Sequence, residues 1–171
     1  MLSAAPSSDP VFLNKFRRAF KNASIFGLAQ IGGLAVYLLV AEIIRAKQKP
    51  FLGFLSSSLT SENRPALRYA FYAASIVTLL LLRFIHGRRL RKIKALDDGG
   101  KALDRLFGAV LIDLILAEIP AILGLILFLI AGYNWDFYVL LFVSLFLLFI
   151  YLPRLKNWED ILQNRPSSCP H

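Results

Sequence analysis

A glutamate and a proline interrupt an otherwise apolar stretch of the sequence, LILAEIPAILGLI at residues 114–126. The carboxyl group of Glu118 can exchange a proton in such surroundings, or it can form hydrogen bonds that join helices. Pro120 has no N–H, so in a helix the carbonyl of Leu116 loses its usual donor. A protonated Glu118 or a donor on another helix could replace it. The chemistry of this stretch therefore depends on where it lies relative to a membrane.

Small residues surround the glutamate at helical spacing. Ala117, Ala121 and Gly124 follow one another at intervals of four and three residues, so a helix places them on one face. Small side chains on a membrane helix let a second helix approach closely. We therefore expect a helix-packing surface with a buried polar point at Glu118.

Other polar residues occur within the apolar blocks of the sequence. Asp113 and Gln30 are expected at similar depth toward the cytoplasmic side, and Arg83 stands near the inner end of its block. We expect Asp113 to contact either Gln30 or Arg83. Glu42 precedes Arg45 by three residues near an outer end, which predicts an interfacial ion pair.

Long apolar blocks must position these residues. The 171-residue chain is 57% hydrophobic, whereas soluble domains are typically about 45–50% apolar. A hydrocarbon core of about 30 Å is crossed by about 20 helical residues. The sequence predicts an all-α integral membrane protein, with residues 1–171 forming one domain. The predicted transmembrane helices are 24–44, 66–85, 106–132 and 137–152.

The distribution of lysine and arginine predicts the orientation of these spans. Basic residues concentrate before the first span, in the link at 86–105 and in the tail at 153–171, and the YNWD turn after the third span has none. Because lysine and arginine mark the cytoplasmic side, both termini are expected to be cytoplasmic. We expect a multi-pass protein of the bacterial inner membrane.

Short amphipathic helices are expected at both ends of the chain. Phe12, Phe16 and Phe20 recur every four residues among basic residues, a pattern typical of an interfacial helix before the first span. Asp9 is a plausible N-cap for it, and Pro10 suits its first position. RLKNWEDIL at 154–162 has apolar residues at helical spacing after the last span.

The predicted third span places Glu118 near the middle of the bilayer. It lies about twelve residues into the span, which corresponds to a depth of about 18 Å. A charged side chain there costs about 2.5–3.5 kcal/mol, so the carboxyl group tends to hold a proton and to face other helices or a water-filled cavity. We favour a packing or assembly role. A proton or ion role is the alternative, and a bound quinone or lipid is a third possibility.

The segment AEIPAILGLILFLI at 117–130 resembles the ion-carrying helix of rotary ATPase proteolipids, the c-ring subunits. In that resemblance Glu118 matches the membrane-centred carboxylate of the family. The residues after it that match are Ala121, Ile122, Gly124 and Leu125. The stretches LLVAEI at 38–43 and LILAEI at 114–119 are similar to each other, which is a pattern expected of duplicated helical hairpins. The resemblance implies a proton- or ion-binding site at Glu118.

The remaining features argue against catalysis and nucleic-acid binding. The net charge of +9 comes from basic residues that flank apolar blocks, a pattern that indicates contact with anionic lipids at the 86–105 link. Cys169 is the one cysteine, and it is not expected to form a metal site with His171 alone; His86 is expected to be an interface residue. We expect no cofactor and no enzymatic activity. The sequence predicts an accessory or assembly subunit whose partners are other integral membrane subunits.

Overall fold

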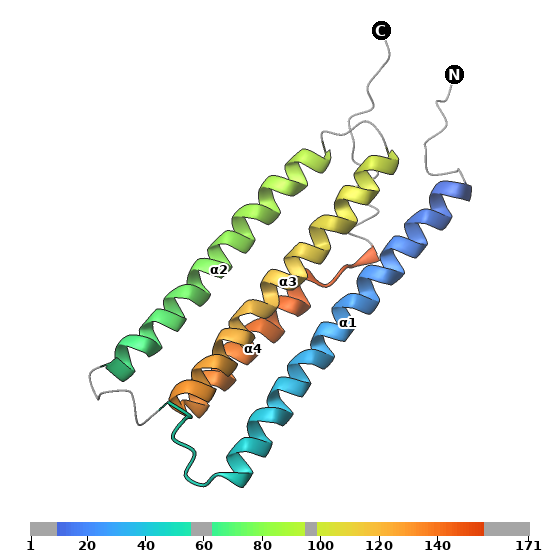
Figure 1. The fold of residues 1–171 in the computed structure, drawn as a ribbon. Helices are drawn as coiled ribbons and strands as arrows, with labels where there is room; N and C mark the ends of the chain where they lie inside the picture. Colours follow the sequence, from blue (N-terminus) through green and yellow to red (C-terminus); the bar gives the residue numbers. More distant parts are fainter. Residues whose placement is uncertain (1–9, 56–62, 95–98, 156–171) are drawn as a thin grey trace, which may run out of the picture.

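The computed structural model describes residues 10–55, 63–94 and 99–155, and every regular element in these ranges is helical. The four long helices are α1 (Pro10–Lys47), α2 (Asn63–Lys94), α3 (Gly99–Ala131) and α4 (Asn134–Tyr151). They run alternately up and down, so the start of α1 and the end of α4 lie at the same end of the bundle (Figure 1). The protein is all-α in the part that the structure describes.

Helix α3 is the central element of the bundle. It packs against each of the other three helices, and its closest neighbour is α4. Helices α1 and α2 lie on opposite sides of it (Figure 1). Because α3 contacts all three other helices, most of the helix packing in the bundle involves its side chains.

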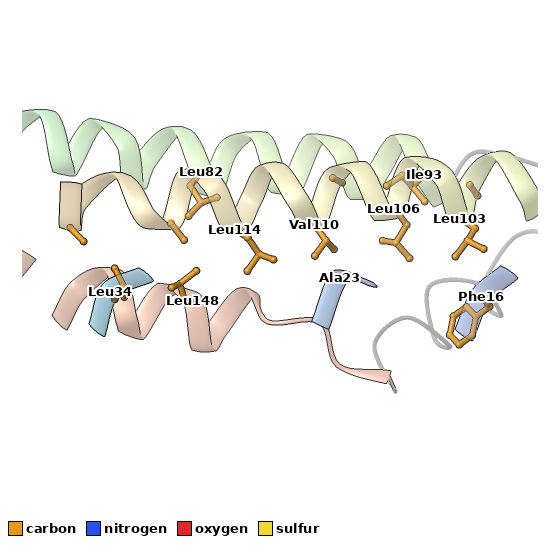
Figure 2. Packing of buried hydrophobic residues seen from close by; sticks show 14 residues of the cluster. Phe16, Ala23, Leu34, Leu82, Ile93, Leu103, Leu106, Val110, Leu114 and Leu148 are labelled. Carbon is orange, nitrogen blue, oxygen red and sulfur yellow. The ribbon is translucent and has the colours of Figure 1, made fainter. Parts of the chain in front are cut away.

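The main hydrophobic core lines α3 along its length. Figure 2 shows that side chains of this helix meet those of the other three helices. Leu114 is fully buried at the centre, and Leu148 of α4 is equally buried. The other labelled members are Phe16, Ala23, Leu34, Leu82, Ile93, Leu103, Leu106 and Val110. A smaller cluster at the opposite end contains Ala41, Phe51, Phe128 and Phe137.

All four helices are long and apolar enough to cross a membrane. Large apolar side chains are exposed along the outward faces of α1 and α2, where lipid would cover them. They include Ile25, Leu28, Val36 and Leu39 on α1, and Ile76, Val77, Leu80 and Phe84 on α2. A multi-pass membrane protein, as the sequence predicts, has this arrangement.

The predicted spans coincide with the four helices, and the differences lie at their ends. Helix α1 is continuous from Pro10 to Lys47, so the residues before 24 extend the first span and do not form a separate element. Pro10 occupies the first helical position as predicted. The predicted N-cap Asp9 and most of the predicted 154–162 helix lie outside the described residues. Helix α3 continues through Pro120.

The loop after α1 covers the end of α3. The backbone N–H groups of Phe54 and Leu55 donate to the carbonyls of Leu129 and Ile130, at 2.8 and 3.2 Å. Gly53 has a φ of +93°, and a Cβ atom on it would lie 2.4 Å from the carbonyl oxygen of Ile130. The contact thus requires glycine at position 53 and supplies donors to the last carbonyls of α3.

Candidate functional site

The carboxyl group of Glu118 joins α3 to α1. The hydroxyl of Tyr37 donates to its Oε1 at 2.6 Å, and Nε2 of Gln30 donates to its Oε2 at 3.2 Å. Gln30 and Tyr37 are two helical turns apart, so they lie on one face of α1. Gly33 lies between them, and a Cβ atom on it would be 3.6 Å from Oε1. Both oxygens of Glu118 are therefore occupied by neutral donors of one neighbouring helix.

The backbone around Pro120 is held by α4. The N–H of Ala121 donates to Oγ of the fully buried Ser144 at 2.8 Å, and the Ser144 hydroxyl points to the carbonyl of Glu118 at 3.5 Å. The sequence predicts that either Glu118 itself or a donor on another helix bonds to the carbonyl of Leu116, whereas the contacts of Ser144 are with Ala121 and Glu118. The carboxyl group turns to α1 instead, and a side chain of α4 contacts the backbone.

Asp113 pairs with a residue of α2. Its Oδ2 lies 2.5 Å from Nδ1 of His86, and its side chain is 2% exposed. The ring of His86 contacts the ring of Tyr151 edge-on, with 5.1 Å between centroids. The expectation that Asp113 contacts Gln30 or Arg83 is wrong. Gln30 lies at the level of Glu118, and Arg83 is exposed on α2.

The opposite end of the bundle contains two further polar groups. Asp136 of α4, with a side chain only 3% exposed, accepts hydrogen bonds from Arg68 and Tyr72 of α2, each at 2.8 Å. Tyr138 of α4 donates to Glu42 of α1. The predicted pair of Glu42 and its i+3 neighbour Arg45 is present at 3.5 Å.

These contacts share one property. Every acidic side chain in the described residues bonds to a side chain of a different helix. The carboxyl groups connect α1 with α3, α1 with α4, α2 with α3 and α2 with α4. Besides the contacts above, the exposed Asp104 of α3 accepts from Lys15 of α1 at 3.0 Å. The acidic residues concerned are Glu42, Asp104, Asp113, Glu118 and Asp136. We call these contacts the acidic ties of the bundle.

The small residues near Glu118 lie in tightly packed parts of α3. Ala117 and Ala121 are fully buried. A Cβ atom on Gly124 would lie 2.9 Å from Cβ of Leu140 and 3.4 Å from the carbonyl oxygen of Phe137. The α4 backbone therefore approaches α3 closely at Gly124.

Several residues of these contacts are not predicted from the sequence. Ser144 is a polar residue in the apolar run FVSLF, and Tyr37 follows Gln30 by two helical turns. A polar residue within an apolar run, and a second polar residue two turns after Gln30, are the sequence signals by which Ser144 and Tyr37 could be recognised as contacts of the Glu118 region. His86 is expected only at the interface. The contacts of Asp136 have no recognisable signal in the sequence, because Arg68 and Tyr72 lie at the start of α2, whose position beside α4 depends on the fold.

No family model matches the chain, and no curated protein and no solved structure shows significant similarity to it. The resemblance of residues 117–130 to the proteolipids remains a prediction. Across residues 10–55, 63–94 and 99–155, no three His, Cys, Asp or Glu side chains lie close enough together to hold a metal ion. The polar groups described above are hydrogen-bonding groups between helices, and they are the chemistry from which a function must be argued.

Proposed function

We propose that this protein is a non-catalytic accessory or assembly subunit of a larger membrane complex. The observation that carries the proposal is the set of acidic ties, in which the acidic side chains of the described residues are engaged between helices. Carboxyl groups used in this way hold a helix bundle in one arrangement. A stable, specific bundle is what a subunit needs in order to present a fixed surface to its neighbours.

The outer faces of α1 and α2 are the surfaces that we assign to partner helices and lipid. Their exposed side chains are large and apolar over the length of the membrane. The two helices lie on opposite sides of α3, so the protein has an apolar surface on each side. In the proposed orientation both chain ends and the basic link face the cytoplasm of a bacterial cell.

A proton or ion conduit centred on Glu118 is the second candidate. It is favoured by Asp113, which lies five residues, or about 7.5 Å, from Glu118 along α3, and which pairs with His86 of α2. Titratable groups at two successive levels are a feature of proton relays. The proteolipid resemblance points the same way. Against it, both oxygens of Glu118 are held by Tyr37 and Gln30.

Two measurements on the same preparation distinguish these functions. A tagged protein is purified in mild detergent from its native membranes, with and without chemical cross-linking, and its size is compared with that of the pure protein. The pure protein is also reconstituted into liposomes under a pH gradient. Stable migration with larger membrane proteins and no flux would support the assembly role. A solitary protein whose flux is abolished by Glu118→Gln would replace it with the conduit.

A further inference from the structure

An open surface cavity of about 270 Å³ lies between α2 and α3 near the end of the bundle that contains the start of α3. Two arginines line it, Arg89 from α2 and Arg105 from α3. The remaining lining residues are Ile93, Gly108, Ala109 and Ile112. The cavity thus combines two permanent cations with an apolar wall, and none of the acidic ties uses either arginine.

The donors of Arg89 are not fully used. Its Nη1 atom is buried and has no hydrogen-bond partner in the described part of the chain. A buried guanidinium donor without an acceptor is unfavourable, and an oxyanion that reached it would supply the missing acceptor. The guanidinium group is also suited to phosphate, whose oxygens accept its paired N–H groups.

The wall at Gly108 is open. A Cβ atom built on this glycine meets no atom within 4 Å. The space beside α3 is therefore not filled by neighbouring side chains at this point. A ligand with an apolar portion could lie against Gly108, Ala109 and Ile112 while its anionic group reaches the arginines.

The depth of the cavity matches a lipid headgroup. Glu118 lies near the middle of the bundle, because Ser144 near the middle of α4 contacts its carbonyl. Ile112 and Arg105 are six and thirteen residues from Glu118, which corresponds to about 9 and about 20 Å along the helix. The hydrocarbon core ends about 15 Å from its centre. The cavity therefore spans the boundary between acyl chains and phosphate groups.

We infer that this cavity is a binding site for the phosphate of an anionic phospholipid, held by Arg89 and Arg105, with the start of an acyl chain along Gly108 and Ile112. The inference is independent of the proposed assembly function. It assigns a defined site to one lipid, which differs from a general attraction between the basic link and a charged membrane surface.

The test uses the purified full-length protein and native mass spectrometry after exchange into equal amounts of phosphatidylglycerol and phosphatidylcholine. The parent should retain phosphatidylglycerol preferentially. Arg89→Gln and Arg105→Gln should each lower its retention about tenfold, because each removes a charged donor. Arg91→Gln is the matched control, since Arg91 is exposed in the same basic segment. It should bind lipid as the parent does.

A second pair of variants tests the cavity without a change of charge. Gly108→Leu fills the cavity and should lower phosphatidylglycerol retention to the same extent. Gly32→Leu is its control, because Gly32 is exposed on α1 and a Cβ atom there also meets no atom within 4 Å. Unchanged retention in the cavity variants, or an equal loss in Arg91→Gln, would overturn the inference.

The source of the phosphate is tested separately. Thermal unfolding of the delipidated protein in detergent is followed with sodium phosphate and with sodium chloride at equal ionic strength. We expect no additional stabilisation by phosphate, because it lacks the apolar portion that the wall accommodates. Stabilisation by inorganic phosphate that Arg89→Gln abolishes, without any lipid preference, would assign the cavity to a soluble phosphate and overturn the lipid site.

Discussion

Ser144 of α4 accepts a hydrogen bond from the backbone N–H of Ala121, the residue that follows Pro120 in α3. The contact lies in the fully buried interior of the bundle, where water is not at hand to replace it. A proline in the central helix is thus accompanied by a hydroxyl group from the helix that packs most closely against it.

Ser144→Ala should therefore destabilise the bundle by about 1 kcal/mol, the usual range for a hydrogen bond between membrane helices. The free energy of unfolding in mixed detergent micelles measures this. Ser75→Ala is the control, because Ser75 is also buried but bonds to the carbonyl of Phe71 in its own helix. Equal losses in the two variants would mean that Ser144 has no special role beside Pro120.

Glu118→Gln should fold and assemble nearly as the parent does. The new amide can still accept from Tyr37, and its NH₂ group can donate to Oε1 of Gln30, which is buried without a partner in the described part of the chain. Glu118→Leu removes both acceptors and should cost about 1–3 kcal/mol, because the donors of the buried Gln30 and the half-buried Tyr37 lose their acceptors. Unfolding and recovery of the assembled complex are measured for the parent and both variants together. Equal instability of Glu118→Gln and Glu118→Leu would contradict this account.

Gly124→Leu should separate α3 from α4. Its Cβ atom alone would lie 2.9 Å from Cβ of Leu140, so the longer side chain forces the helices apart and should cost more than about 1–3 kcal/mol. Gly32→Leu makes the same change at an exposed position of α1 and should be tolerated. The yield of folded protein and its unfolding are the measurements. Similar yields of both variants would show that the close approach at Gly124 is not needed.

Gly53→Ala should weaken the contact between the first loop and the end of α3. The backbone at Gly53 has a positive φ, and the added methyl group meets the carbonyl of Ile130, so we expect a loss of about 1–3 kcal/mol. Gly87→Ala adds the same group in α2 where nothing lies within 4 Å, and it should be neutral or slightly stabilising. Hydrogen exchange at Phe54 and Leu55 reports the loop directly. Unchanged protection there in Gly53→Ala would contradict the prediction.

Orientation can be tested by labelling single cysteines in intact cells. With Cys169 replaced by serine, a cysteine at the exposed Trp135 should react with an impermeant thiol reagent from outside. A cysteine at Arg91 should react only after the membrane is opened, because the basic link is predicted to be cytoplasmic. The reverse pattern would invert the topology.

The sequence predicts the helices well and their contacts poorly, for different physical reasons. Long apolar blocks are sufficient to locate membrane helices, because the bilayer sets their length. The continuation of α1 back to Pro10 is not predicted, because the basic residues around Phe12 and Phe16 indicate an interface, although nothing there breaks a helix. The depth of a residue in the bilayer can be estimated from its position along the span, and this estimate places Glu118 near the middle of the membrane.

The partners of the acidic residues depend on quantities that hydropathy does not contain. Gln30 is expected beside Asp113, but it lies beside Glu118, five residues further along α3. The vertical offset between two helices and the rotation of each about its axis follow from side-chain packing along the whole interface. The partners of Asp136 are not predictable for the same reason. Its bonds to Arg68 and Tyr72 form only because one end of α2 lies beside α4.

The central position of α3 has a consequence for how the chain is made. Helices α1 and α2 enter the membrane first, and they do not pair with each other across α3. The side chains that they carry within the spans include the neutral groups of Gln30, Tyr37 and Tyr72. The carboxyl groups of Asp113, Glu118 and Asp136 come later, on α3 and α4, when their partners are already in place. For these three acidic residues the order of synthesis delivers the carboxyl group after its partners, whereas Glu42 of α1 is made before its partner Tyr138 of α4.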